Sequence, residues 1–199
     1  MDVGTAVTAA WSSGISMYGV LALLGIAGRA GWIEGFSLLQ RPGVLGVLIV
    51  LFVIELIADK VPYVDSAWDA VHTVLRPIAG AFVMTQAHDA SFGEPVLALS
   101  GGLLALSSHS AKASTRLVVN TSPEPASNIV VSVLEDGFVG VLMALAFAYP
   151  EAALAITLVL AVVSIVVAVV LFRTARGITR RLRARRRAAR ASRAGPPLD

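Results

Sequence analysis

Residues 152–172, AALAITLVLAVVSIVVAVVLF, decide the fold, because they run without a single charge until Arg173 follows them. At about 1.5 Å per residue, a helix of this length covers the roughly 30 Å hydrocarbon core of a bilayer. Uncharged apolar runs of this length are typical of transmembrane helices rather than of soluble cores. The stretch therefore predicts a membrane-spanning helix that ends beside Arg173.

The composition of the whole chain agrees with a membrane protein. Of its 199 residues, 56% are hydrophobic and 15% are charged, and the mean hydropathy is +0.78. Soluble domains carry about 25% charged residues. The sequence contains no cysteine, which excludes disulfides, thiolate metal sites and a cysteine nucleophile.

Charge is divided unequally between the body of the chain and its C-terminal tail. Residues 173–199 hold ten arginines and one acid, whereas residues 1–172 hold six basic and twelve acidic residues. The positive-inside rule places such a tail in the cytoplasm. We expect a transmembrane helical domain over 1–172 and a disordered, Arg-rich cytoplasmic tail over 173–199 that binds anionic lipids and no nucleic acid.

Five other segments are predicted to span the membrane, although each carries polar residues: 3–28, 42–59, 65–88, 95–120 and 128–149. The predicted fold class is therefore all-α, a polytopic helical membrane protein with 5–6 transmembrane helices. If 65–88 crosses, there are six spans and both termini are cytoplasmic. If segment 65–88 does not cross, there are five spans and the N-terminus lies outside the cytoplasm. We favour six, because 24 residues are enough to cross.

The six segments also suggest an internal repeat. The segments divide into two groups of three, 3–88 and 95–172, and the first member of each group has a Ser-rich polar break. The second member of each group has an acidic pair. Three spans per group would make the groups antiparallel, so the pattern predicts two inverted three-helix repeats, as in many secondary transporters.

Ionisable side chains inside the predicted spans need an explanation, because each costs several kcal/mol in lipid unless it is paired or hydrated. Their spacing puts them on shared helix faces, for example at i, i+4, i+7 and i+11 from Asp65. Asp65 can instead cap its helix, and Lys60 can reach the headgroups. We expect a buried polar site built from Glu55, Asp59, Asp69, His72, Arg76, His109, Lys112, Arg116, Asn120, Glu135 and Asp136.

Other chemistries receive little support from the sequence. There is no G-x-S-x-G elbow, P-loop or H-E-x-x-H motif, so neither an enzyme nor a cofactor is expected, and the metal question stays open. The same charged residues would also suit structural ion pairs that only specify packing.

Gly137 and Gly140, close to the acidic pair of 128–149, are expected to let helices approach closely.

Several longer motifs resemble those of a family of small bacterial integral-membrane proteins catalogued only as a domain of unknown function. The motifs are ELIADKVP at 55–62, DSAWD at 65–69, HSAKASTR at 109–116 and SVLED at 132–136. The resemblance covers about residues 5–150. It implies a membrane fold and points to the same polar residues, but it brings no established activity.

The function that the sequence favours is a small transporter or channel of the bacterial inner membrane, handling a proton, a cation or a small solute. Because one such bundle has little interior volume, we expect a homo-oligomer. An alternative is a lipid-handling protein whose Arg76, Lys112 and Arg116 hold a lipid phosphate, and a third is a non-transporting scaffold. The net charge of −6 in residues 1–172 favours a cation or proton over a bare anion.

A C-terminal reporter fusion tests the predicted orientation. A fluorescent reporter that folds only in the cytoplasm should be bright when fused after Asp199, because ten arginines precede it. The matched fusion to alkaline phosphatase should be inactive. Activity of the phosphatase fusion would place the tail on the outside and contradict the orientation.

Overall fold

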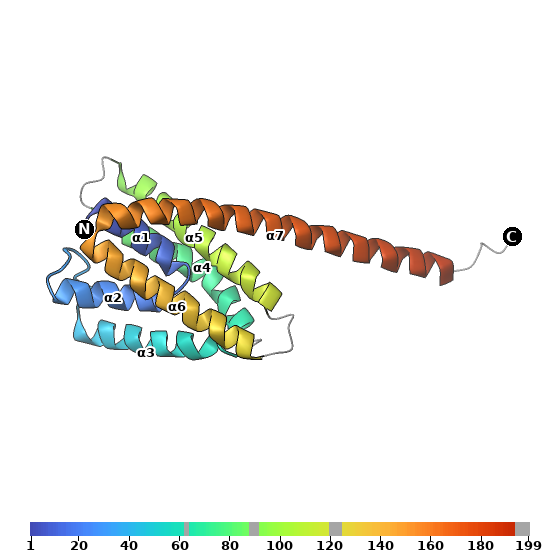
Figure 1. The fold of residues 1–199 in the computed structure, drawn as a ribbon, viewed down its shortest axis with the longest axis horizontal. Coiled ribbons are helices and arrows are strands. Elements are labelled where there is room, and N and C mark those ends of the chain that lie inside the picture. The colour runs from blue at the N-terminus through green and yellow to red at the C-terminus, as the bar shows by residue number, and fades with distance from the viewer. Residues whose placement is uncertain (62–63, 88–91, 120–124, 194–199) are drawn as a thin grey trace.

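The structure, a computed structural model, describes residues 1–61, 64–87, 92–119 and 125–193, and the regular secondary structure of these residues is all helical. The absence of strands in this part of the chain confirms the all-α class. Figure 1 shows the order of the seven helices along the bundle: α1 (Val3–Ser13), α2 (Met17–Arg29), α3 (Pro42–Ala58), α4 (Val64–Met84), α5 (Glu94–Val119), α6 (Pro125–Ala148) and α7 (Pro150–Arg193).

The first predicted span, 3–28, is not one helix but a helical hairpin. α1 ends at Ser13, α2 begins at Met17, and the chain reverses direction between them (Figure 1). Met1 and Asp2, before α1, line the same pocket as Trp32, which follows α2. The chain thus enters and leaves the bundle at one end. α1 has 11 residues, or about 16 Å of helix, and every residue after Val3 is buried.

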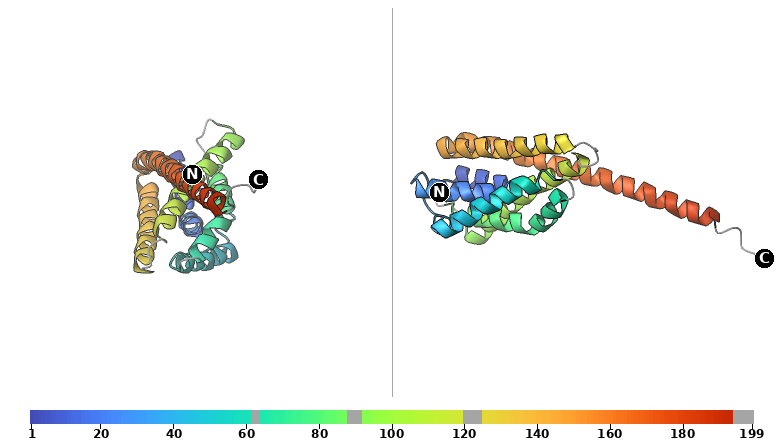
Figure 2. Two further views of the ribbon diagram at one scale, coloured as in Figure 1. Left: turned by 90° about the vertical axis from the view of Figure 1, so that its right-hand side faces the viewer. Right: turned by 90° about the horizontal axis from the view of Figure 1, so that it is seen from below.

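The other five helices, α3 to α7, run alternately up and down the bundle, and α7 ends beyond the end of the bundle that is opposite to the N-terminus (Figures 1 and 2). Segment 65–88, on which the number of spans depended, does form a long helix, α4. The favoured six-span arrangement counted 3–28 as one helix, and the hairpin found there does not run the length of the bundle. The five longer helices are α3 to α7.

The two groups of segments that the sequence suggested as inverted repeats, 3–88 and 95–172, differ in their helices. The first group contains a hairpin and two long helices, whereas the second contains three long helices. The difference lies in the two polar breaks. Ser107 and Ser108 donate hydrogen bonds to carbonyl oxygens, including that of Leu104 in the preceding turn, and α5 continues through them.

Glycines decide how closely the central helices pack. A Cβ on Gly14, at the tip of the hairpin, would overlap the carbonyl oxygen of Ala105 and the hydroxyl of Ser108 on α5. Gly80 of α4 and Gly101 of α5 face each other in the same way, so these two helices cross with their backbones in contact. The expectation for Gly137 and Gly140 is wrong, since a Cβ on either would meet nothing within 4 Å.

The bundle carries apolar side chains on its outside and charged side chains in its interior. Val71, Leu99 and Val141 are 61%, 66% and 71% exposed, whereas Glu55 and Arg76 are 0% exposed. Two stretches of the described chain, Ile129–Ala148 and Pro150–Thr174, are long and apolar enough to cross a membrane, and α2 and α3 are shorter apolar helices. These features indicate association with a membrane.

The segment after residue 172 differs from the expected disordered tail, because α7 continues as a helix to Arg193. Arginine and alanine, which dominate this region, are among the best helix formers. No proline follows Pro150 until Pro196, so nothing stops the helix earlier than that. The first part of the tail therefore extends beyond the bundle as a helix (Figure 2).

Replacing Gly14 with alanine should destabilise the protein by about 1–3 kcal/mol, because the new Cβ has to displace the backbone of α5. Thermal unfolding in detergent measures this as a lower midpoint temperature. Gly137→Ala is the matched control: its Cβ meets open space, and alanine favours a helix by about 1 kcal/mol over glycine. Equal midpoints for both variants would contradict the close contact at the tip.

Candidate functional site

The tip of the α1–α2 hairpin exposes backbone groups that a continuous helix would have paired. The last carbonyl groups of α1 and the first amide groups of α2 have no partner within their own helices. Three carbonyl oxygens at the tip accept hydrogen bonds from α4 and α5, and Trp11 O accepts in addition the backbone N–H of Gly14 at 3.1 Å. Gly14 O accepts from Arg76 Nη1 at 3.0 Å, Ile15 O accepts from Lys112 Nζ at 2.9 Å, and Trp11 O accepts from the Ser108 hydroxyl.

The other side of the tip binds a carboxylate. Glu55 of α3 accepts hydrogen bonds from the backbone N–H groups of Met17 and Tyr18, at 3.4 and 3.3 Å, and from the Ser16 hydroxyl at 3.4 Å. The N-terminus of a helix carries a partial positive charge and its C-terminus a partial negative charge. The cations at the end of α1 and the anion at the start of α2 therefore both complement the helix dipoles.

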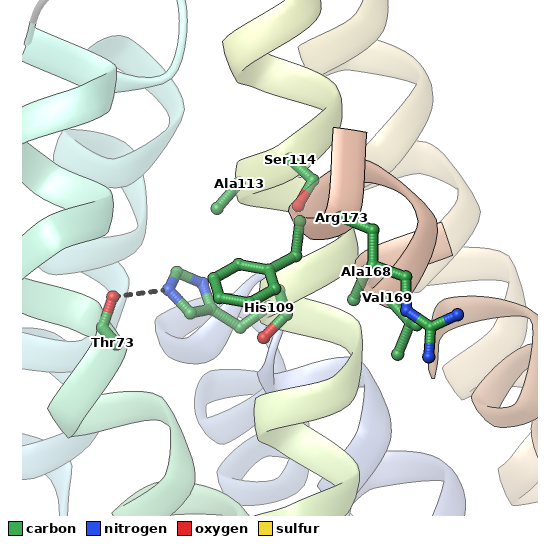
Figure 3. A pocket seen from close by; sticks show the side chains of 9 residues that line it. Thr73, His109, Ala113, Ser114, Ala168, Val169 and Arg173 are labelled. Atoms are coloured by element: carbon green, nitrogen blue, oxygen red, sulfur yellow. Dashed lines mark hydrogen bonds between the residues drawn. The ribbon is translucent and has the colours of Figure 1, made fainter. Parts of the chain in front are cut away.

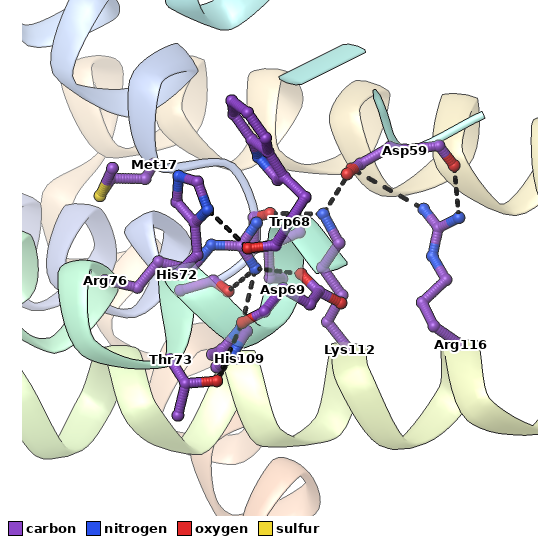
Figure 4. A network of polar contacts seen from close by, with 12 residues as sticks. Met17, Asp59, Trp68, Asp69, His72, Thr73, Arg76, His109, Lys112 and Arg116 are labelled. Carbon is purple, nitrogen blue, oxygen red and sulfur yellow. Dashed lines mark hydrogen bonds and ion pairs between the residues drawn. The ribbon is translucent and has the colours of Figure 1, made fainter. Parts of the chain in front are cut away.

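Arg76 joins the tip to three other helices. Its guanidinium contacts Glu55 at 3.0 Å and Asp69 at 3.3 Å, and it donates to the Gly14 carbonyl and, at 2.8 Å, to Nδ1 of His109 (Figure 4). The side chain is completely buried. Because a guanidinium has its donors in one plane, these contacts fix how α1, α3, α4 and α5 lie around it.

A second group of ion pairs adjoins the first and reaches α6. Lys112 pairs with Asp59 at 2.5 Å, and Arg116 contacts Glu135 at 2.6 Å and the Asp59 carboxylate at 3.9 Å. Arg116 also donates to the Asp59 backbone carbonyl at 2.9 Å. Asp59 thus lies between two cations, and the network runs without interruption from the hairpin tip to α6.

The charges of this cluster are not balanced. Six carboxyl groups are buried or half-buried in the described bundle, against four cationic side chains, Arg76, Lys112, Arg116 and the half-buried Lys60. If every acid were ionised, two negative charges would remain in the described interior. Buried charge of that size needs protons or counter-ions to neutralise it. The acids are Glu55, Asp59, Asp65, Asp69, Glu135 and Asp136.

Ten of the eleven residues that the sequence selected for the site lie in this cluster, and the eleventh, Asn120, lies outside the described residues. Asp65, for which helix capping was the alternative, lies fully buried in the first turn of α4, and Lys60 donates to the Leu56 carbonyl at 2.7 Å. Asp136 lies beside Ser16 at the hairpin tip.

Sequence reasoning missed the backbone part of the site. Backbone groups bind the charged side chains at the tip, and no side-chain motif in the sequence predicts them. They are the carbonyls of Gly14 and Ile15 and the amides of Met17 and Tyr18. The only signal for them was the polar break at Ser12-Ser13-Gly14 inside an apolar segment.

The two histidines of the cluster have different hydrogen-bond partners. Nδ1 of His72 lies 2.7 Å from the Trp68 carbonyl oxygen, which can only accept, so His72 carries its proton on Nδ1. Nδ1 of His109 receives a hydrogen bond from Arg76, which can only donate, so His109 carries its proton on Nε2. That Nε2 is 3.0 Å from the Thr73 hydroxyl, which donates to the Asp69 carbonyl.

An open pocket of about 540 Å³ lies beside this histidine, between α4, α5 and α7. Figure 3 shows His109 in its wall, bonded to Thr73, with Arg173 at the opposite side. In the part of the chain that the structure describes, no group of three or more histidine and carboxylate side chains could hold a metal ion. The site therefore offers ion pairs and titratable side chains, and His109 contacts both the ion pairs and the pocket.

Comparison with known proteins gives one match. A protein-family model described as "Domain of unknown function (DUF4126)" matches residues 3–170, which include the hairpin, all the charged residues of the cluster and the apolar part of α7. Searches of curated proteins and of solved structures found no match.

The tautomers of the two histidines can be measured directly. In protein labelled with ¹⁵N-histidine and embedded in lipid nanodiscs, we expect His72 to be protonated at Nδ1 and His109 at Nε2, at about pH 8. His72→Gln and His109→Gln variants assign the two signals. The same tautomer at both residues would contradict the hydrogen bond from Arg76 to His109.

Proposed function

The chain belongs to this family of unknown function, and from its own site we propose that it is a polytopic membrane protein that transports a proton or a small cation. The single observation that carries the proposal is the hairpin whose tip ends inside a buried cluster with more acids than bases. The proposal depends on the arrangement of the helices in the membrane and on the chemistry of the site.

In the membrane, we place α3 to α7 as crossing helices and α1–α2 as a hairpin that enters from one side. Non-helical backbone at membrane depth is tolerated only where protein or water surrounds it, and α1 is surrounded by other helices. Lys60 and Arg116 lie toward the end with the Arg-rich tail, whereas Arg29 and Arg41 lie at the other end. The positive-inside rule then puts the tail in the cytoplasm and the N-terminus outside.

The chemistry of the site favours a cation or a proton. Interrupted helices whose ends meet ionisable groups in the bundle interior are the usual construction of transport sites. Here the excess of carboxyl groups has to be neutralised, and binding or release of a proton or cation would do so. Such exchange changes the charge on the ligands of the hairpin tip, which is what coupling to a movement requires.

The lipid-phosphate alternative has less support. Arg76, Lys112 and Arg116 would be its ligands, but each already holds at least one carboxylate. A lipid phosphate would have to compete with those carboxylates and would leave them unpaired. The scaffold alternative accounts for the ion pairs but leaves the excess of acids without a purpose.

Flux measurements in reconstituted vesicles test the proposal. The purified protein should dissipate an imposed gradient of H⁺, Na⁺ or K⁺, followed with ion-sensitive dyes. Glu135→Gln should lower that flux at least about tenfold, because it removes the carboxylate that is half-buried beside Arg116. Glu34→Gln is the matched control, since Glu34 is exposed and outside the cluster.

Stability measurements separate transport from a structural role. Breaking a buried ion pair costs about 3–5 kcal/mol, so Glu55→Gln is expected to lower the unfolding temperature as well as the flux. Glu135 is less buried and should keep a folded protein, judged by gel filtration and circular dichroism. If the wild-type protein moves none of these ions and both variants only lose stability, the scaffold interpretation holds and the proposal fails.

A further inference from the structure

The pocket beside His109 is formed by small side chains on two neighbouring helices. Ser110, Ala113 and Ser114 line it from α5, and Ala168 lines it from α7. Because these side chains are short, the helices leave about 540 Å³ open between them (Figure 3). No carboxylate among the described residues lines this pocket, and the proposed transport function does not use it.

Two serine hydroxyls in the pocket have no hydrogen-bond partner among the described residues. Ser100, Ser107 and Ser108, on the same helix, each donate to a carbonyl oxygen in the preceding turn. Ser110 and Ser114 make no such bond, although they lie one turn apart and are half-buried. An acceptor inside the pocket would therefore satisfy both hydroxyls.

A cationic side chain at the same pocket also lacks a partner in the described part of the chain. Arg173 of α7 is exposed at the pocket and forms neither an ion pair nor a side-chain hydrogen bond there (Figure 3). It differs in this from Arg76, Lys112 and Arg116, each of which holds a carboxylate. Arg173 can thus bind an anion without losing an ion pair, and a guanidinium matches two oxygens of a phosphate group.

The position of the pocket along α7 selects a lipid as the source of that phosphate. Residues 152–172 are uncharged and Arg173 follows them, so in the proposed arrangement the pocket opens at the cytoplasmic boundary of the hydrocarbon core. Phospholipid headgroups begin at that depth. Val169 and Phe172, which also line the pocket, are 43% and 60% exposed, so acyl chains can pack beside them.

We propose that this pocket binds the phosphate of an anionic phospholipid, with Arg173 and the hydroxyls of Ser110 and Ser114 as its donors. The inference goes beyond the proposed transport function and shares with it only the placement of α7 in the membrane. It also differs from a general attraction of lipids to the Arg-rich tail, because the two hydroxyls and the cavity belong to the bundle. A choline lipid should bind less well, because no described carboxylate lines the pocket to pair with its ammonium group.

Lipid titration followed by native mass spectrometry tests the site. The full chain, delipidated in a neutral detergent, is titrated with dioleoyl phosphatidylglycerol, and the fraction with bound lipid gives an apparent Kd. Arg173→Gln and the double variant Ser110→Ala, Ser114→Ala should each weaken the first binding event at least about tenfold, because each removes hydrogen bonds to a charged group. Dioleoyl phosphatidylcholine should bind the wild-type protein at least about fivefold more weakly than phosphatidylglycerol.

Two further variants separate the pocket from the charge of the tail. Arg187→Gln, the matched control, removes the same charge farther along α7 and should weaken binding less than about twofold. Ala168→Leu fills the pocket without changing any charge, so it should weaken binding at least about tenfold while the unfolding temperature does not fall. An equal loss for Arg173→Gln and Arg187→Gln, or wild-type binding by Ala168→Leu, would overturn the inference.

Soluble sn-glycerol 3-phosphate distinguishes a lipid from a free phosphate ester. It offers a glycerol phosphate without acyl chains and should bind at least about a hundredfold more weakly than phosphatidylglycerol, because it covers no apolar surface at the pocket. Equal affinity for the two would overturn the assignment to a lipid. Ion flux remains a separate readout. Lipid binding without flux of any ion removes only the proposed function, and flux without a specific lipid site removes only this inference.

Discussion

The contact between the Arg76 guanidinium and the tip of the α1–α2 hairpin is the interaction on which the rest of the structure depends. Ending a helix inside an apolar bundle exposes carbonyl and amide groups that cost free energy unless they are hydrogen-bonded. Arg76 satisfies the Gly14 carbonyl and also binds Glu55, whose carboxylate satisfies the opposite side of the break. Without this arginine the Gly14 carbonyl would lose its donor and Glu55 would lose its buried cationic partner.

The need to hydrogen-bond the backbone groups at this helix break explains why the interior contains charged side chains. An ordinary buried polar group would need one partner, but the break presents a negative helix end and a positive helix end side by side. Cations from α4 and α5 bind the first, and a carboxylate from α3 binds the second. Each of these charges then needs its own counter-charge, which brings in Asp69 and Asp59, and through Arg116 also Glu135. The network grows outward from the hairpin.

The excess of carboxyl groups is the feature of the cluster on which the proposed transport function rests. Structural ion pairs are neutral as a group, because an unpaired buried charge destabilises the fold. This cluster instead holds more acids than bases, and one of its histidines lies at a pocket. The proposed transport of a proton or cation would use this excess of carboxyl groups, whereas packing alone gives it no role.

The sequence by itself determined the helical class and the identity of the charged cluster, because both depend on short-range patterns. The spacing of Asp65, Asp69, His72 and Arg76 places them on one helix face whatever that helix packs against, and that face is buried. Only the tertiary structure decided that residues 3–28 turn back. A continuous span and a hairpin have the same composition, and the choice depends on contacts of Gly14 with Ala105 and Ser108, about 90 residues away. The pairing of each cation with its carboxylate is equally non-local, because it is set by how four helices cross.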